Sequence, residues 1–538
     1  MSKAFAKSLS QLNKALVRRL KALVVVTRAQ PPAPARPTTW SDALPSPSGG
    51  GGGVAVCKVE GGLLRSSSAF PYFMLVALEG GGLARALLLL LLYPALRLLG
   101  HDTAVRAMAA VTFLGLRKDA AAFRAGRASL PRLLLEDVSA EVFDAAVAPP
   151  RRRCVCVSAM PRAMVQPFLA EYLGVDAVVA PEVREFGGYY LGVMEDESEV
   201  LRRLDVDKVI AGDKKGGGCG VFGVAGLGSS FDQLFQNHCK EVYAPTESAR
   251  RRWHALPRRR YPRPLIFHDG RIAFRPTPCA TLAMFMWVPL GVALAVARVA
   301  TFLALPFSLS VPLLAALGMH SRVIANPASA SKSLFACNHR SLLDPLYVAA
   351  AAGRKDLAAA TYSISRLSEA LSPIPTFRLT RDRAADRAAM HARLRSCGGL
   401  VVCPEGTTCR EPYLLRFSPL FAELGHDVAP VALHSSVGMF HGTTAAGWKA
   451  LDPLFLLMNP TPAYIVHFLD TVDVECGGPE AARAVANELQ RRIAEALGYT
   501  CTGLTRKDKY LMLAGNEGIV DGSHGSGGSK KRTTCAAT

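Results

Sequence analysis

The feature that most restricts the fold is a long apolar stretch just past the middle of the chain. About 22 uncharged, mostly apolar residues occupy positions 276–297, and about 21 more occupy 299–319, with only Arg298 between them. Because about 20 such residues suffice for a helix to cross a bilayer, the length criterion is met twice. No loop separates the halves, and prolines lie inside them. We therefore expect residues 276–320 to form a membrane hairpin, either re-entrant or as two spans.

Composition and charge agree with membrane association. Half of the 538 residues are hydrophobic and the mean hydropathy is +0.20, which is more apolar than a typical soluble enzyme. The formal net charge is +20, but the basic residues gather beside apolar segments and do not alternate with aromatic residues. This favours anionic lipid headgroups over nucleic acid as the partner. The arginine-rich linker at 246–275 precedes the apolar stretch, so its side of the membrane is expected to be cytosolic.

The two ends of the chain carry targeting or linker signals. Residues 1–41 contain eight Lys or Arg and no acidic residue, and a Pro- and Gly-rich linker continues to residue 53. This composition fits either an amphipathic, mitochondrial-type leader or a basic arm that touches membranes. The endoplasmic reticulum is the expected location, with a mitochondrial membrane as the alternative. Residues 519–538 are expected to be a disordered tail.

Cysteine usage points to reduced thiols and to no metal site. Of the 13 cysteines, only Cys154 and Cys156 lie close together in the sequence. Neither the cysteines nor the histidines show the spacing of a metal-ligand set. We expect free thiols facing the cytosol and no bound metal.

Two short motifs beyond the apolar stretch predict an active site. The octet NHRSLLDP spans residues 338–345, and VVCPEGTTCR follows at 401–410. The run before His339 is typical of a buried strand and Asp344 starts a helix, so the imidazole is expected at a strand end beside a helix N-terminus. There Asp344 can orient one imidazole nitrogen and leave the other as a base toward a substrate hydroxyl. The alternative is a surface histidine with Asp344 as a simple helix cap.

The second motif predicts a substrate-binding turn. Residues 400–403 are typical of a short strand, and it leads into a Pro-Glu-Gly turn at 404–406 that can present amides and a carboxylate to hydroxyls or a phosphate. Between the two motifs, Arg378 and Arg381 are candidates for a bidentate grip on a phosphate. A further strand that ends in a loop is expected at 426–436.

In this order the four segments resemble the H(x)4D, arginine, PEG and V-P-V/I blocks of the phospholipid and glycerol acyltransferase family. Two later segments, 441–464 and 501–518, look like the C-terminal part of the land-plant glycerol-3-phosphate acyltransferases. The likeness covers roughly residues 54–520. It implies attack of a glycerol 3-phosphate hydroxyl on an acyl-CoA thioester.

The resemblance also implies residue roles. It implies that His339 is the base and that Asp344 is its carboxylate partner. It also implies that Arg378, Glu405 and Gly406 contact the glycerophosphate. One position departs from the family, because the residue before the PEG turn is commonly aromatic and here is Cys403.

A compact α/β domain is expected upstream, over residues 54–245. Strand, turn and helix follow one another at 54–64, 154–174 and 221–243. This alternation resembles the haloacid dehalogenase-like phosphatase domain that precedes the acyltransferase in the plant family, with Ser158 in its second motif.

The residues that such a phosphatase needs have changed. It uses a nucleophilic aspartate and an acid–base aspartate two positions on, where this chain has Lys58 and Glu60. A lysine cannot form the acyl phosphate, and it places a cation where Mg²⁺ would bind. Ser229 stands where a metal-binding aspartate is expected, although Asp232 remains. We expect this domain to lack phosphatase activity, so that the phosphate stays on the product.

The sequence thus predicts two α/β domains, haloacid dehalogenase-like and then glycerolipid acyltransferase-like, joined by a hydrophobic membrane hairpin. The second domain is expected at 321–518. The resemblance implies a membrane-bound enzyme that acylates glycerol 3-phosphate, at the sn-2 hydroxyl, to give lysophosphatidic acid for glycerolipid or cutin- and suberin-type lipid synthesis. Acyl-CoA, glycerol 3-phosphate and the bilayer are the expected partners, with no cofactor. The alternatives are acylation of lysophosphatidic acid, a working phosphatase that releases monoacylglycerol, and a non-enzymatic membrane scaffold.

Overall fold

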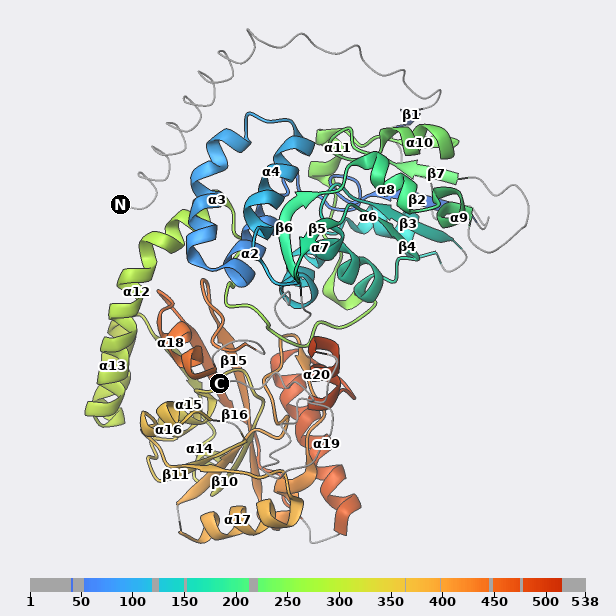
Figure 1. Cartoon of the computed structure of the whole chain (residues 1–538). Coiled ribbons are helices and arrows are strands. Elements are labelled where there is room, and N and C mark those ends of the chain that lie inside the picture. Colours follow the sequence, from blue (N-terminus) through green and yellow to red (C-terminus); the bar gives the residue numbers. More distant parts are fainter. Residues whose placement is uncertain are drawn as a thin grey trace, which may run out of the picture. The chain divides into compact units, whose positions relative to one another are not determined.

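The computed structural model describes most of the chain and divides it into two compact units (Figure 1). The first unit ends at Pro264 and includes residues 275–282, and the second comprises residues 265–274 and those from Ala283 onward. The expected leader and the expected tail at 519–538 lie outside the described residues, except for a short strand at 40–41. The described residues are 40–41, 53–118, 125–149, 152–211, 221–362, 364–396, 398–444, 449–474 and 478–514.

The first unit is built on a six-stranded, fully parallel sheet in the order β1-β8-β7-β2-β3-β4. Its central strands, with sequences VAVCK and RCVCV, are almost wholly buried, as parallel strands covered on both faces must be. The α/β alternation predicted for this part of the chain is confirmed. The strands are β1 (Trp40–Ser41), β2 (Val54–Lys58), β3 (Arg153–Val157), β4 (Ala177–Val179), β7 (Val221–Val224) and β8 (Glu241–Tyr243).

Helices and a small hairpin complete the first unit. Figure 1 shows α2 (Phe70–Gly81), α3 (Leu83–Leu96) and α4 (His101–Phe113) side by side, and the hairpin β5 (Val183–Phe186)–β6 (Tyr189–Met194) packs on α4. The chain separates α2 from α3 at Gly82, whose φ of 83° suits glycine. The other α-helices are α5 (Leu130–Leu135), α6 (Ala140–Val142), α7 (Arg162–Gln166), α8 (Glu197–Arg203), α9 (Val206–Ala211), α10 (Asp232–His238) and α11 (Glu247–Arg252).

The second unit contains a seven-stranded sheet in the order β12-β11-β13-β10-β15-β16-β9. Every pairing in it is parallel except that of β15 with β16. The strands are β9 (His320–Ile324), β10 (Leu334–Cys337), β11 (Leu357–Thr361), β12 (Thr376–Arg378), β13 (Gly399–Val402), β15 (Val428–Ser436) and β16 (Ala463–Phe468); β14 (Tyr413–Leu414) and β17 (Thr500–Cys501) form a separate pair. The fully buried β10 lies at the centre, so the residues that follow it emerge in the middle of the sheet edge.

Amphipathic helices cover this sheet. α19 (Gly478–Leu497) has apolar residues at helical spacing, and it buries Ala486, Leu489 and Ile493 in the core formed with β10, β13 and β15. Apart from those of the apolar stretch, the other α-helices of the described part of this unit are α14 (Pro327–Ala330), α15 (Asp344–Ala351), α16 (Arg366–Ala370), α17 (Arg383–Ser396), α18 (Asp452–Leu457) and α20 (Arg506–Ala514). Together these elements confirm the predicted α/β class of the second domain.

The apolar stretch forms one long helix and one short helix, not a hairpin turning at Arg298. α12 (Pro278–Ala304) runs through Arg298 without a break, and the interruption comes at Pro306, before α13 (Phe307–Ala316). In Figure 1 α13 continues in the direction of α12 and does not fold back along it. Among the described residues, α12 alone is long and apolar enough to cross a membrane. Only 22% of its most apolar 18-residue segment is buried. Side chains such as Leu290 and Val296 are more than half exposed, unlike those of a core helix in a soluble protein.

Arg298 explains why the helix continues where a break was expected. Its side chain is fully buried, and its guanidinium donates five hydrogen bonds, all to backbone carbonyls. Leu317 beyond α13 accepts two of them, at 2.5 and 3.2 Å, and the end of α18 and the residues after it accept the rest at 2.6–2.9 Å. Because carbonyls at helix C-termini lack intrahelical partners and carry partial negative charge, they can hold this cation without a carboxylate.

Candidate functional site

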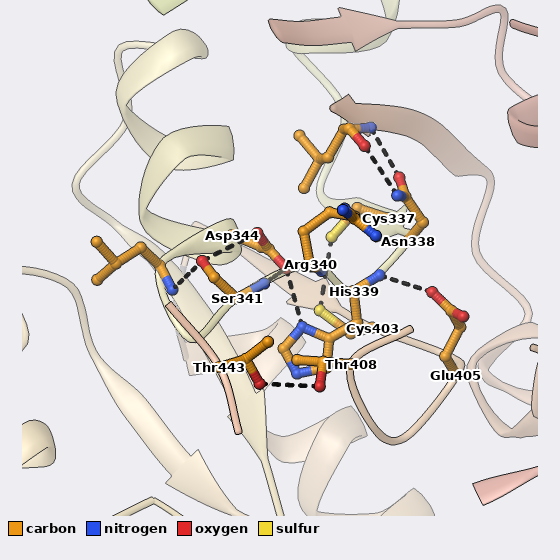
Figure 2. A network of polar contacts seen from close by, with 12 residues as sticks. Cys337, Asn338, His339, Arg340, Ser341, Asp344, Cys403, Glu405, Thr408 and Thr443 are labelled. Carbon is orange, nitrogen blue, oxygen red and sulfur yellow. Dashed lines mark hydrogen bonds and ion pairs between the residues drawn. The ribbon is translucent and has the colours of Figure 1, made fainter. Parts of the chain in front are cut away.

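The two predicted motifs meet at one edge of the second unit's sheet. β10 and β13 are adjacent and parallel, so the residues after their carboxyl ends emerge side by side. His339 follows β10, and the turn at 404–406 follows β13. Figure 2 shows the resulting network, in which His339 lies with Asp344, Cys403 and Glu405.

His339 and Asp344 form the hydrogen-bonded pair that the octet predicts. Nδ1 of His339 is 2.9 Å from Oδ2 of Asp344, and the carboxylate fixes this nitrogen as the N–H donor. Nε2 is then the nitrogen left to accept a proton. The imidazole lines a cavity and its side chain is 21% exposed, whereas Asp344 is fully buried. The geometry therefore joins an accessible base to an inaccessible carboxylate.

The Asp344 carboxylate is held by more than the histidine. The backbone N–H groups of Arg340 and Ser341 donate to Oδ2 at 2.5 and 2.8 Å, and the hydroxyl of Tyr464, on β16, donates to Oδ1 at 3.1 Å. These donors belong to the turn after β10 and to a strand more than 100 residues later in the chain. Together these donors fix the position of the Asp344 carboxylate behind the imidazole.

Neighbouring groups change the acidity of His339. Burial alone lowers the pKa of the imidazole, but Cys403 and the Asp344 carboxylate raise it, and the net pKa lies well above the usual histidine value. The neighbouring thiol of Cys337, together with burial, raises the pKa of Cys403. The arrangement stabilises an imidazolium, which is what a general base becomes after it takes a proton.

Glu405 lines the cavity, and its carboxylate bonds to the backbone. Its carboxylate is almost fully buried, with 2.7 Å between Oε1 and the backbone nitrogen of His339 and 2.8 Å between Oε2 and that of Leu415. Burial raises the pKa of Glu405 to about 7, against the opposing effect of these two donors. Both oxygens are thus used inside the protein, where they tie the turn to His339. Gly406 has a φ of 67°, lines the cavity, and lets the turn close through its N–H to Cys403 O, 3.0 Å.

The cavity next to His339 has a volume of about 720 Å³ and a strongly basic lining. It is formed within the second unit by residues of the two motifs and of the C-terminal segments. Six cationic side chains line it, namely Arg381, Arg383, Arg416, Lys449, Arg506 and Lys509. A cavity that places one base beside several cations is suited to a hydroxyl-bearing substrate with anionic groups.

Of the two predicted phosphate ligands, the structure brings Arg381 to the cavity and not Arg378. Arg378 ends β12, its side chain is 47% exposed, and it pairs with Glu369 at 2.7 Å outside the cavity lining. Arg381 lies three residues later with a φ of 71°, where its N–H donates to Asp386 at 2.9 Å. This left-handed turn directs the chain back toward the cavity, and sequence spacing alone did not reveal it.

Lys509 is a site residue that sequence reasoning missed. It lies on α20, is 2% exposed, and donates from Nζ to the carbonyl of Thr408 at 2.5 Å and to the hydroxyl of Thr407 at 3.1 Å. Burial lowers the pKa of its amine. The hydroxyls of Thr408 and Thr443 are 3.0 Å apart on the same cavity (Figure 2). The conspicuous signal was the lysine-rich sequence TRKDKYL, but nothing local links it to a turn about 100 residues earlier.

The altered phosphatase positions also come together, in the first unit. Lys58 ends β2 and is almost fully buried, and its Nζ donates to the carbonyls of Gly228 and Ser230 at 2.9 and 2.8 Å. The same nitrogen is 3.7 Å from Oδ1 of Asp232. The Lys58 ammonium therefore hydrogen-bonds to the loop just before Asp232, the acidic residue that remains.

Glu60, Ser158 and Ser229 are equally engaged. Glu60 is buried and accepts hydrogen bonds from Ser158 Oγ at 2.6 Å and from the N–H of Met160 at 3.0 Å. Ser229 donates its N–H to Oδ2 of Asp102, on α4, at 2.8 Å. Glu60 and Ser229 thus bond to other groups of the protein, while Oδ1 of Asp102 is buried without a hydrogen-bond partner.

Comparison with known proteins gives the same two-part division. A family model described as "Glycerol-3-phosphate acyltransferase RAM2-like, HAD-like domain" matches residues 54–245, and one described as "Acyltransferase" matches residues 321–434. The "Probable glycerol-3-phosphate acyltransferase 2" of Arabidopsis thaliana is 47% identical, covering 86% of this chain and 89% of that protein. The "Probable glycerol-3-phosphate acyltransferase 3" of the same species is 48% identical, covering 86% of this chain and 90% of that protein. "Glycerol-3-phosphate acyltransferase RAM2" of Petunia hybrida is 41% identical, covering 86% of this chain and 97% of that protein.

Replacing Glu405 tests whether it is a structural link. In Glu405→Gln one acceptor oxygen becomes an amide group that cannot accept the N–H of His339 or Leu415, so we expect a loss of about 1–3 kcal/mol in the free energy of unfolding. Thermal unfolding of the purified protein would measure the loss. Glu423→Gln, at a partly exposed ion pair with Arg383, is the control and should cost less than about 1 kcal/mol. Equal stability of Glu405→Gln and the parent protein would contradict this structural role.

Proposed function

This chain belongs to the plant glycerol-3-phosphate acyltransferase family, and on that premise we propose that His339 is the general base that activates the glycerol 3-phosphate hydroxyl toward acyl-CoA. The observation that carries the proposal is the pairing of His339 with the buried Asp344 at the edge of a basic cavity. The two requirements of the reaction are a proton acceptor for the hydroxyl and positive charge for the phosphates. Both occur within this one cavity.

The proposed step proceeds by direct attack. The substrate hydroxyl gives its proton to Nε2 of His339 as its oxygen bonds to the thioester carbonyl carbon, and the Asp344 charge stabilises the resulting imidazolium. Collapse of the tetrahedral intermediate breaks the carbon–sulfur bond, and the imidazolium returns the proton to the CoA thiolate. Lysophosphatidic acid and CoA are the products. We propose no cofactor for this step, because acyl-CoA supplies the acyl group and His339 accepts the proton.

The cationic residues are proposed to divide between the phosphates of the two substrates. Arg381 replaces Arg378 as the expected contact of the glycerol phosphate, since Arg381 alone of the two lines the cavity. Lys509 holds the turn after Glu405 in place through its bonds to Thr407 and Thr408. This assignment gives Gly406 a role through its backbone only.

Membrane attachment is proposed to occur through α12. The helix meets the length and hydropathy criteria for a span and exposes apolar side chains. The product of the reaction is a lipid, so an enzyme that releases it beside a bilayer is chemically reasonable. The proposal places the active site toward the cytosol at the endoplasmic reticulum, with a mitochondrial membrane as the alternative. Acylation at the sn-2 hydroxyl and a role in cutin- or suberin-type lipids belong to the same proposal.

We also propose that the first unit does not hydrolyse phosphate esters. An aspartyl-phosphate mechanism needs a free carboxylate as nucleophile and a divalent cation beside it. Lys58 fills the nucleophile position and bonds the loop at 228–230, while the Glu60 carboxylate is occupied by Ser158 and Met160. The inserted ammonium would repel Mg²⁺ from this position.

The His339 and Asp344 roles are tested by variants and pH. His339→Ala should lower kcat by about 10²–10⁴-fold, the usual contribution of a general base. Because the base must be unprotonated and its pKa is raised, kcat/KM of the parent protein should rise with pH through a midpoint above the ordinary histidine value. Asp344→Asn removes the stabilising charge, so its residual activity should show a midpoint at lower pH. The exposed His426→Ala is the control, and a fully active His339→Ala would refute the mechanism.

Arg381 and Arg378 offer a matched pair. Arg381→Gln should raise KM for glycerol 3-phosphate about tenfold or more, because a charge-assisted hydrogen bond contributes about 1.5–3 kcal/mol. Arg378→Gln, three residues away and outside the cavity, should leave KM unchanged. Steady-state kinetics at saturating acyl-CoA would distinguish them. A larger effect at Arg378 would reverse the assignment.

The inactive phosphatase unit predicts the product. With glycerol 3-phosphate, acyl-CoA and Mg²⁺ supplied, the full-length protein should yield lysophosphatidic acid and release no inorganic phosphate. Thin-layer separation of radiolabelled product, together with a phosphate assay, would measure both. Monoacylglycerol formation that disappears in Asp232→Asn would show that the first unit is an active phosphatase.

A further inference from the structure

Two thiols lie directly behind the proposed base. Cys337 is the last residue of β10 and Cys403 follows β13, so the pairing of these strands brings the two sulfur atoms to 3.6 Å from each other (Figure 2). One ligand atom each of His339, Asp344 and Cys403 lie within 4.8 Å of one another. The sequence predicted no metal-ligand set, because Cys337 and Cys403 are 66 positions apart and the other residues lack the spacing of metal ligands. The pairing of β10 with β13 brings them together.

The distance between the sulfur atoms favours one kind of chemistry. Two thiolates bound to one tetrahedral zinc ion at about 2.3 Å each lie about 3.8 Å apart. A disulfide requires about 2.0 Å and a rotation of both side chains. At the observed 3.6 Å the two reduced thiols hydrogen-bond to each other, and they need little movement to reach the spacing of a metal-bound pair, unlike that of a disulfide.

The donor atoms also match a soft or borderline cation. Thiolate sulfur and imidazole nitrogen select zinc-like ions over Mg²⁺ or Ca²⁺, which require oxygen ligands. Cys403 and His339 line the cavity, so an ion has a route from solvent to the pair, while Cys337 and Asp344 are buried behind them.

We propose that Cys337, Cys403 and His339, with Asp344 beside them, form an inhibitory site for a zinc-class divalent cation. Binding exchanges the two thiol protons for the metal and occupies the imidazole that the reaction needs as a base. A metal ion on either nitrogen leaves the ring without a nitrogen that can accept the substrate proton. The inhibitory effect rests on the role proposed for His339, whereas metal binding itself does not.

The test uses the reduced full-length protein in detergent with Cd²⁺ as the probe, since thiolate–cadmium bonds give an ultraviolet charge-transfer band. We expect a band that saturates at one Cd²⁺ per chain, parallel loss of acyl transfer, and recovery of activity on chelation. Cys337→Ala should weaken Cd²⁺ binding by about tenfold or more and shift inhibition equally, each variant being compared with its own metal-free activity. Cys501→Ala, at an exposed thiol, should respond like the parent protein.

Each other outcome has a defined meaning. A missing band, or a band unaffected by Cys337→Ala, would overturn the site. Inhibition reversed by a thiol reductant and not by a chelator would overturn it in favour of oxidation. A Cys337-dependent band without loss of acyl transfer would overturn the inhibition. The role of His339 as base is decided separately by the activity of His339→Ala.

Discussion

The catalytic edge of the second unit depends on one buried charge, the carboxylate of Asp344. It accepts the imidazole N–H of His339, two backbone N–H groups of the octet and the hydroxyl of Tyr464. A carboxylate removed from water costs several kcal/mol unless such donors compensate it. The same bonds that make the burial tolerable also fix the turn after β10, the start of α15 and the inner face of β16. Orientation of the base and local folding are therefore one arrangement.

The second buried carboxylate, Glu405, performs the complementary task. It joins the backbone of His339 to that of Leu415 and so keeps the turn after β13 against the turn after β10. Both of its oxygens accept hydrogen bonds from the backbone, although the residue also lines the cavity. Six cationic side chains line the same cavity and outnumber its three carboxylates, Asp386, Glu405 and Asp452, which suits anionic substrates.

The sequence predicted the parts that are local and missed those that depend on distant segments. The strand, loop and helix around His339 and Asp344 follow from short-range pattern, and the first α/β domain follows from repeated strand–helix alternation. The second domain was predicted from the order of its motifs and the family that they resemble. Arg378 and Arg381 could not be separated, because the left-handed backbone at Arg381 decides which reaches the cavity. Lys509 arrives from a helix about 100 residues later, a contact that no local pattern encodes.

Arg298 gives the apolar helix a fixed setting. An apolar helix without a polar anchor can rotate or slide in lipid at little cost. Here the Arg298 guanidinium joins α12 to carbonyls at the ends of α13 and α18. In the proposed membrane-bound state, the helix cannot adjust alone to a thinner or thicker bilayer. Hydrophobic mismatch would tilt the helix and the acyltransferase unit together. The height of the cavity mouth above the lipid surface would then follow bilayer thickness.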